Sequence, residues 1–309
     1  EIRLSLVGSE MCIRDSHCAY APIIGGMSIL VSPHELRDKI YRGDKTTILS
    51  SLWAPGEGEA FNQFSSLHVP TAQYADAASA FVGLPGSKVG RNPLPQPEKI
   101  QEWINHWGLR EDYEVVVYDE GRGLFAGRAW WTLRWAGVQN VRILDGGLSN
   151  WRAQGMATMT GPGNLGMTSN ITVQPGSMPT VTIDEVKEHT GLLLDARTRN
   201  RFAGRRENLD LKAGHIPGAV NLPERLFHTD GVTVWRSKEE ILDILGQHGV
   251  TKENTEGAII YSGSGNHSSL AIALFEYVGL TGLRHFVGGW SQWSANPKNP
   301  IERGDRDHV

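Results

Sequence analysis

Short runs of apolar residues alternate along the chain with longer segments whose apolar residues recur at helical spacing. Residues 258–261 form one such run, and apolar side chains then recur at helical intervals from Leu270 to Val278. Residues 114–119 form a second run, followed by a helical pattern over 126–136. A short apolar run predicts a strand buried on both faces, and the longer spacing predicts a helix. Because the two alternate, we expect an α/β fold, a mostly parallel sheet with helices on both faces.

This order of elements occurs twice, which predicts two similar domains. After its helix, each half contains a further apolar run and a Gly-Gly sequence, Gly146-Gly-Leu-Ser-Asn-Trp151 in the first half and Gly288-Gly-Trp-Ser-Gln-Trp293 in the second. Residues 155–180 are rich in Gly, Met, Thr, Ser and Pro and lack an apolar period, which is typical of a linker. We predict an N-terminal domain over 27–154, a linker over 155–180 and a C-terminal domain over 181–309.

Composition narrows the function classes without naming one. The chain has 309 residues, 39% hydrophobic and 21% charged, which suits two globular domains of about 150 residues each. A net charge of -4 and a pI near 6.3 leave no basic surface for nucleic acid or acidic membranes. No apolar stretch approaches the roughly 20 residues that span a bilayer, and no signal peptide is evident, so we expect a cytoplasmic protein.

Both cysteines lie near the start of the chain. Cys12 and Cys18 precede Met27, in a segment without apolar periodicity that reads like translated adapter sequence. We interpret residues 1–26 as a non-native or disordered leader, with Met27 as the first native residue. The remaining chain contains no cysteine, which argues against a disulfide, a zinc thiolate site and a cysteine persulfide. We expect neither a metal nor a cofactor.

The loop at residues 262–268 is the most informative segment for chemistry. It reads Ser-Gly-Ser-Gly-Asn-His-Ser and stands between a predicted strand and a predicted helix. A glycine-rich loop before a helix directs unpaired backbone N–H groups and the positive end of the helix dipole at one point. The sequence therefore predicts a cradle for an anion.

This loop resembles the active-site loop of the two-domain rhodaneses, the thiosulfate and 3-mercaptopyruvate sulfurtransferases, which reads Cys-Gly-Ser-Gly-Val-Thr-Ala. In the resemblance Ser262 takes the place of the cysteine that carries the persulfide, and residues 266–268 depart from the family sequence. Other segments match in the same order: Arg128-Ala-Trp-Trp-Thr-Leu-Arg134, Asp195-Ala-Arg197, Gly214-His-Ile-Pro-Gly-Ala219 and Gly288-Gly-Trp-Ser-Gln-Trp293. The resemblance implies two rhodanese-like domains, with the active site in the C-terminal one.

A serine at position 262 changes the chemistry that the resemblance implies. The family's intermediate is an enzyme persulfide, which requires a sulfur atom on the enzyme. A serine hydroxyl without an adjacent base is a poor nucleophile. Three roles remain open for Ser262: a cap of the following helix, part of a retained anion site, or a serine nucleophile.

The resemblance also implies roles for side chains around the loop. Arg197 and Arg201 match arginines that hold the charged end of the substrate, although either could form an ion pair within its domain. Ser264 and His68 match a serine and a histidine of a proton relay, with Glu57 or Glu59 as the acid, although His68 could equally be structural. The predicted anion-binding set is Arg197, Arg201, Gly263, Ser264, Gly265, Asn266, His267 and Ser268.

The corresponding loop of the N-terminal half contains Asp119 and Glu120. An acidic pair opposes anion binding, so we expect this half to be a scaffold that closes one side of the site.

Three hypotheses for function follow. The chain is a sulfurtransferase relative with lost or impaired catalysis, a binding module for an anion or for a protein's persulfide, or an active enzyme whose cysteine codon was misread. The expected ligand is a small sulfur-containing anion or oxyanion, and the acceptor a thiol or a protein. No nucleic acid or membrane is expected as a partner.

Overall fold

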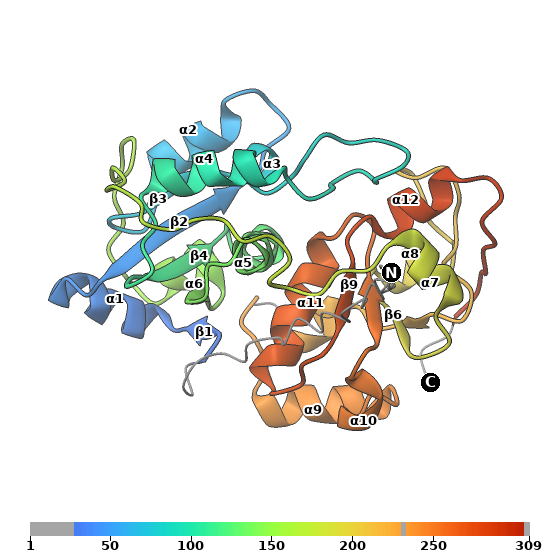
Figure 1. Cartoon of the computed structure of the whole chain (residues 1–309). Coiled ribbons are helices and arrows are strands. Elements are labelled where there is room, and N and C mark those ends of the chain that lie inside the picture. Colours follow the sequence, from blue (N-terminus) through green and yellow to red (C-terminus); the bar gives the residue numbers. More distant parts are fainter. Residues whose placement is uncertain (1–27, 230–232, 306–309) are drawn as a thin grey trace, which may run out of the picture.

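The structure is a computed structural model that describes residues 28–229 and 233–305. The predicted leader at 1–26 lies outside the described residues. Two parallel sheets flank a central pair of helices, α5 (Leu124–Trp135) and α11 (Asn266–Tyr277) (Figure 1). Within the described ranges, no helix is both long and apolar enough to cross a membrane.

The N-terminal sheet has five parallel strands in the order β1-β5-β4-β2-β3. The strands are β1 (Leu30–Val31), β2 (Thr46–Leu52), β3 (Gln73–Asp76), β4 (Glu114–Tyr118) and β5 (Val141–Leu144). The other helices are α1 (Pro33–Arg42), α2 (Glu59–Ser66), α3 (Ala77–Ala80), α4 (Pro97–Trp107) and α6 (Gly147–Ala153). Alternate residues of β4 serve the two faces, since Val115 and Val117 belong to the core beneath α3, α4 and α5, and Val116 to the core beneath α1, α2 and α6.

The C-terminal sheet has four parallel strands in the order β7-β6-β8-β9. These are β6 (Leu193–Asp195), β7 (Val220–Asn221), β8 (Ile259–Tyr261) and β9 (Arg284–Phe286). The helices are α7 (Ile183–Glu188), α8 (Arg199–Phe202), η1 (Glu224–Phe227), α9 (Lys238–Gln247), α10 (Lys252–Thr255), α11 and α12 (Gly289–Ala295). The predicted α/β fold with two parallel sheets is confirmed.

The duplication extends to single hydrogen bonds. The ring of His68 stacks on Phe64 and that of His215 on Phe202, and each histidine bonds through Nδ1 to the carbonyl oxygen of that phenylalanine, at 2.9 Å in both halves. In each half the amide of the residue after the histidine donates to a tyrosine hydroxyl at the end of the central strand, Tyr118 or Tyr261. The two domains therefore share one plan, with equivalent strands and loops.

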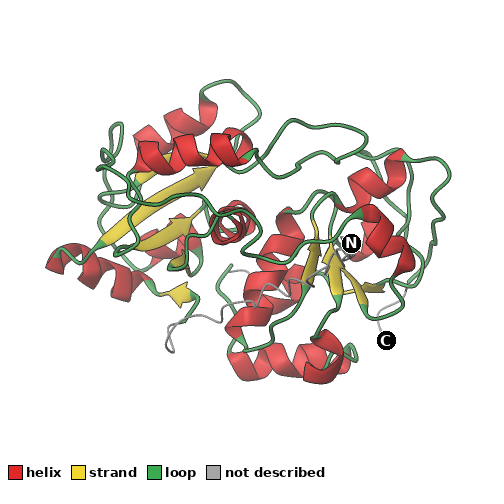
Figure 2. Ribbon diagram, in the orientation of Figure 1, coloured by secondary structure: helices red, strands yellow, loops and turns green. Residues whose placement is uncertain are grey.

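Helices α5 and α11 pack against each other between the sheets (Figure 2). A Cβ atom on Gly127 would lie 2.8 Å from the Cα of Leu270, so the absence of a side chain at Gly127 permits this close crossing. The two helices are buried along most of their length and join the inner faces of both sheets in one apolar core. A helix buried on most sides has no extended polar face, which is why apolar residues occur at nearly every position of α11 from Leu270 to Phe275.

Candidate anion-binding site

The loop at 262–268 connects β8 to α11, and its geometry corrects two expectations. The helix begins at Asn266 rather than Leu270, and its N-cap residue is Gly265. Gly265 has φ 92°, a left-handed conformation that favours glycine. Ser262 lies three residues before the cap, so it is not the helix cap.

Ser262 is the first member of a buried hydrogen-bonded chain. Its Oγ accepts a bond from the amide of Gly265 at 3.1 Å and lies 3.0 Å from Oγ of Ser268. Ser268 Oγ in turn lies 2.7 Å from Nε2 of His285, on β9. All three polar side chains are fully buried. The hydroxyl of Ser262 is thus held in place by the protein itself.

His285 was not predicted from the sequence, because a histidine within an apolar strand carries no local sign of function. Burial lowers the pKa of its imidazole well below the ordinary value, and the nearby charge of Arg128 lowers it further. The ring packs edge to face with Trp131, with centroids 4.6 Å apart. A neutral imidazole with so low a pKa is a weak base, so this chain of contacts does not favour Ser262 as a nucleophile.

The equivalent loop of the N-terminal half shows how this backbone holds an anion. The carboxylate of Asp119 accepts four amide hydrogen bonds, from Gly121 at 2.8 Å, Gly123 at 3.0 Å, Phe125 at 3.0 Å and Ala126 at 3.3 Å. The sequence suggested that an acidic residue here would oppose anion binding, and this expectation was wrong for Asp119. Instead, Asp119 supplies the anion.

Backbone contacts establish which residues of the two loops correspond. Gly123 and Gly265 are both left-handed N-caps, and the carbonyl of each accepts from the amide four residues later. Counting from these caps, the amides of Phe125 and Ala126 correspond to those of His267 and Ser268. In the described part of the chain, these two C-terminal amides have no protein acceptor. They are available to an external anion.

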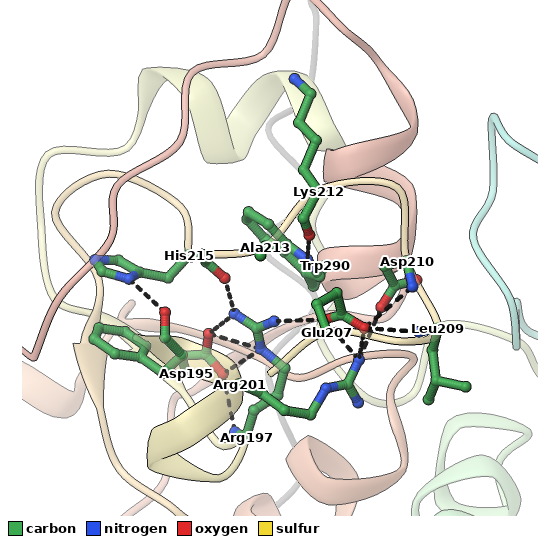
Figure 3. Close-up of polar contacts among 12 residues, drawn as sticks. Asp195, Arg197, Arg201, Glu207, Leu209, Asp210, Lys212, Ala213, His215 and Trp290 are labelled. Carbon is green, nitrogen blue, oxygen red and sulfur yellow. Dashed lines mark hydrogen bonds and ion pairs between the residues drawn. The ribbon is translucent and has the colours of Figure 1, made fainter. Parts of the chain in front are cut away.

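The guanidinium groups of two arginines lie beside this loop. A Cβ atom on Gly263 would lie 3.2 Å from Nη1 of Arg201 and 3.4 Å from Nη2 of Arg91. Asp210 forms ion pairs with both arginines. Figure 3 shows Arg201 beside Asp210 and Glu207, and Glu207 accepts from Arg201 at 2.9 and 3.0 Å. The structure thus places Arg201 beside the loop, where the sequence expected it. Arg91 was missed, because it comes from a segment of the N-terminal half with no recognisable motif.

Arg197 has a different environment from the one expected. Its guanidinium donates to Asp195 at 2.6 and 3.0 Å and to the carbonyl of Gly214 at 2.7 Å, and it lies over the ring of Trp290 (Figure 3). The side chain is 1% exposed. Because these groups already satisfy its charge, we correct its role to support of the C-terminal fold rather than contact with a ligand.

The expected relay of Ser264 and His68 is also replaced by other contacts. Ser264 Oγ accepts from Asn92 at 2.9 Å, so the partner from the N-terminal half is an amide. His68 stacks on Phe64 and pairs through its backbone with Met159, as His215 pairs with Glu302. These contacts favour the structural role that the sequence left open for His68, and the equivalent contacts of His215 agree with it.

The remaining loop side chains lie at its open edge. His267 Nδ1 is 3.1 Å from Oε1 of Glu224, a carboxylate only 10% exposed. That imidazole lowers the pKa of Glu224, against the effect of burial. Asn266, His267 and Ser264 are partly exposed, whereas Gly263, Gly265 and Ser268 are buried. An anion would reach the amides past the first three residues.

The fold and this loop define a duplicated α/β protein in which backbone amides at the start of a central helix line the C-terminal loop. A model of the rhodanese-like domain matches residues 57–154 and 182–296, and the chain belongs to the rhodanese family.

Relatives with sulfurtransferase names are similar over most of the chain. The chain is 34% identical over 281 residues to SseB of Mycobacterium tuberculosis, named as a thiosulfate sulfurtransferase, with 89% of this chain and 97% of that protein covered. It is 30% identical over 214 residues to 3-mercaptopyruvate sulfurtransferase of Escherichia coli, with 68% and 75% covered. The structure of 3-mercaptopyruvate sulfurtransferase from Leishmania major matches with a TM-score of 0.77 and 26% identity, over 91% of this chain and 78% of that one. The chain is thus related to both types of sulfurtransferase, as the resemblance implied.

Proposed function

We propose that this chain is a sulfurtransferase relative that binds a small oxyanion or sulfur-containing anion in the loop at 262–268 and transfers sulfur poorly or not at all. The single observation that carries this proposal is the Asp119 carboxylate in the equivalent N-terminal loop. The equivalent C-terminal loop is one residue shorter between its strand and its cap and has no carboxylate of its own, and it offers the amides of His267 and Ser268 to a ligand. Arg91 and Arg201 lie beside Gly263, where both are paired with Asp210 and Arg201 also with Glu207.

The loss of catalysis rests on the chemistry of Ser262, which we place at the position of the family's persulfide cysteine. A hydroxyl cannot form the sulfur–sulfur bond of the persulfide. In addition, the Ser262 hydroxyl is bonded to Gly265 and Ser268 and is fully buried.

A sulfur-transfer assay with thiosulfate or mercaptopyruvate as donor and cyanide as acceptor tests the proposed loss of catalysis. The protein should show no transfer above background, and Ser262→Cys should create activity because the helix dipole and amides stabilise a thiolate. Ser177→Cys, at an exposed position away from the loop, is the control for an added thiol and should stay inactive. Turnover of the serine form at ordinary enzyme rates would show that the chemical argument is wrong.

Titration calorimetry with sulfate tests anion binding. We expect a Kd in the millimolar range, about −4 kcal/mol, that weakens as chloride screens the charges. Arg201→Ala should weaken binding by about 1.5–3 kcal/mol, the usual worth of a charge-assisted hydrogen bond. Arg205→Ala is the matched control, because Arg205 instead pairs with Asp305. Equal sulfate affinity in the two variants would show that Arg201 does not contact the bound anion.

A second candidate function is binding of a partner protein that carries a persulfide. Two exposed apolar side chains favour it, Leu209 at 61% and Leu211 at 82%, which flank the Asp210 that holds both arginines. If this is the function, Leu211→Ser should abolish capture of a persulfide-bearing protein and leave sulfate affinity unchanged.

A further inference from the structure

Residues 84–91, between α3 and α4, form an arm that leaves the N-terminal half and reaches α12 of the C-terminal half (Figure 1). At its base, the amide of Gly83 donates to the carbonyl of Pro93 at 2.9 Å. At its tip, Gly86 and Gly90 exchange two backbone bonds, at 2.8 and 3.0 Å. The arm is therefore a closed unit that holds its own shape and is joined to its domain by a narrow base.

Three polar contacts fasten the arm to the C-terminal half in the part of the chain that the structure describes. The carbonyl of Lys88 accepts from Gln292 at 2.6 Å. The amide of Arg91 donates to Oγ of Ser291 at 3.0 Å, and its guanidinium pairs with Asp210. Most of the arm is exposed, so little apolar surface holds it in place. Contacts of this kind can break without unfolding either domain.

The docked arm is connected to the anion loop at 262–268. Ser291 accepts from the arm through Oγ, and its own amide donates to the carbonyl of Gly263 at 2.9 Å. The guanidinium of Arg91 also lies beside this loop, since a Cβ atom on Gly263 would lie 3.4 Å from Nη2. The arm thus covers the start of the loop.

The docked arm also balances the charge beside the loop. Two cations and two anions meet there: Arg91, Arg201, Glu207 and Asp210. Arg197 lies 3.8 Å from Glu207 but adds no net charge, because it is paired with Asp195. When the arm leaves with Arg91, one negative charge is in excess, and it repels an anion in the loop.

We propose that the arm is a lid over the loop at 262–268, and that lid closure and anion binding favour each other through the charge of Arg91. Because such coupling is reciprocal, a bound anion holds the lid closed, and a closed lid raises anion affinity by the same factor. Opening of the lid lowers that affinity and releases the anion. The inference rests on the proposed anion site and adds its regulation.

Hydrogen exchange measured with and without sulfate tests the effect of the anion on the lid. The Arg91 amide is the reporter, because its acceptor, Ser291, belongs to the other half. Saturating sulfate should slow exchange of this amide at least about fivefold, the factor that one unit charge at about 4 Å produces in water. Amides of β4 should exchange at an unchanged rate.

A variant that cannot close the lid tests the effect of the lid on the anion. A Cβ atom on Gly90 would lie 2.7 Å from the carbonyl oxygen of Gly288, and Gly90 has φ 88°, so Gly90→Ala should keep the lid open. Sulfate affinity should fall about fivefold, and Asp210→Asn in the same chain should restore it by removing the excess negative charge. Gly86→Ala is the matched control, because its methyl group would meet only Val89, at 3.5 Å.

The outcomes separate the lid from the anion site. If sulfate binds but leaves the exchange of Arg91 unchanged, or if Gly90→Ala and Gly86→Ala bind sulfate equally well, the inference is wrong and the anion site stands. If sulfate does not bind to the unaltered protein, the anion site fails and the inference fails with it. If Gly90→Ala does not fold, Gln292→Ala replaces it, since loss of the contact with Lys88 should also speed exchange of Arg91 and weaken sulfate binding.

Discussion

Replacement of Asp119 by asparagine would test whether the loop backbone holds an anion by its amides. The carboxylate accepts two amide bonds on each oxygen, at 2.8 and 3.0 Å on Oδ1 and at 3.0 and 3.3 Å on Oδ2. Asparagine keeps one oxygen and places an NH₂ group opposite the other two amides, which are donors themselves. Two charge-assisted bonds are lost, and two donors are left without an acceptor.

The expected loss in the free energy of unfolding follows from the two hydrogen bonds that the variant loses. A hydrogen bond to a charged group contributes about 1.5–3 kcal/mol, which gives about 3–6 kcal/mol for two. The variant is also spared the cost of burying a carboxylate, so we expect a net loss near 3 kcal/mol in the free energy of unfolding. That is a large fraction of the roughly 5–15 kcal/mol that typically holds a domain folded.

Urea denaturation followed by circular dichroism measures this loss as a lower midpoint. The matched control is Asp112→Asn, which removes an exposed carboxylate paired with Lys45 and should leave the midpoint almost unchanged. A loss below about 1 kcal/mol for Asp119→Asn would show that the amides do not depend on negative charge. The argument for the equivalent loop at Ser262 would then fail as well.

Two further predictions concern the packing of α5 against α11. Gly127→Ala should destabilise the protein by about 1–3 kcal/mol, because the new methyl group would meet Leu270 at 2.8 Å. The control Gly246→Ala, in an exposed turn of α9 with no atom nearby, should stabilise the protein slightly. Equal urea midpoints for the two variants would refute the close crossing of the helices. Burial raises the pKa of Glu276, 3.5 Å from Arg134, from its ordinary value of 4.5 to about 8. The folded protein therefore retains a proton there that the unfolded chain has lost, and this contribution to stability, complete below about pH 4.5, should decrease as the pH rises to 8. Glu276→Gln should make the melting temperature less dependent on pH across that range, and an unchanged slope would contradict the assignment.

The sequence predicted the fold well because both signals it used are local. Apolar runs placed β4 and β8 within one residue of their observed limits, and the repeated order of elements predicted two similar sheets. The start of α11 was placed too late, at Leu270, because its first turn is polar and its cap is a glycine rather than a serine.

Parts of the site could not be predicted, because they depend on contacts between distant residues. Arg91, Asn92 and Arg128 reach the loop from the other half of the chain. The packing of α5 on α11 brings Arg128 there, and direct contacts with Ser291 and Ser264 bring Arg91 and Asn92. Arg197 shows the converse error. The resemblance implied contact with a ligand, but Asp195, two positions away, takes up the charge of Arg197.

The duplication has a consequence for how many ligands one molecule can hold. The Asp119 carboxylate is tethered to its own loop by a single methylene group, so it acts as a ligand that cannot diffuse away. Its effective concentration at the N-terminal amides exceeds that of any free anion in solution, and added salt cannot displace it in the way it displaces a dissolved ion. Each chain should therefore saturate with one anion rather than two, although it contains two loops of the same design.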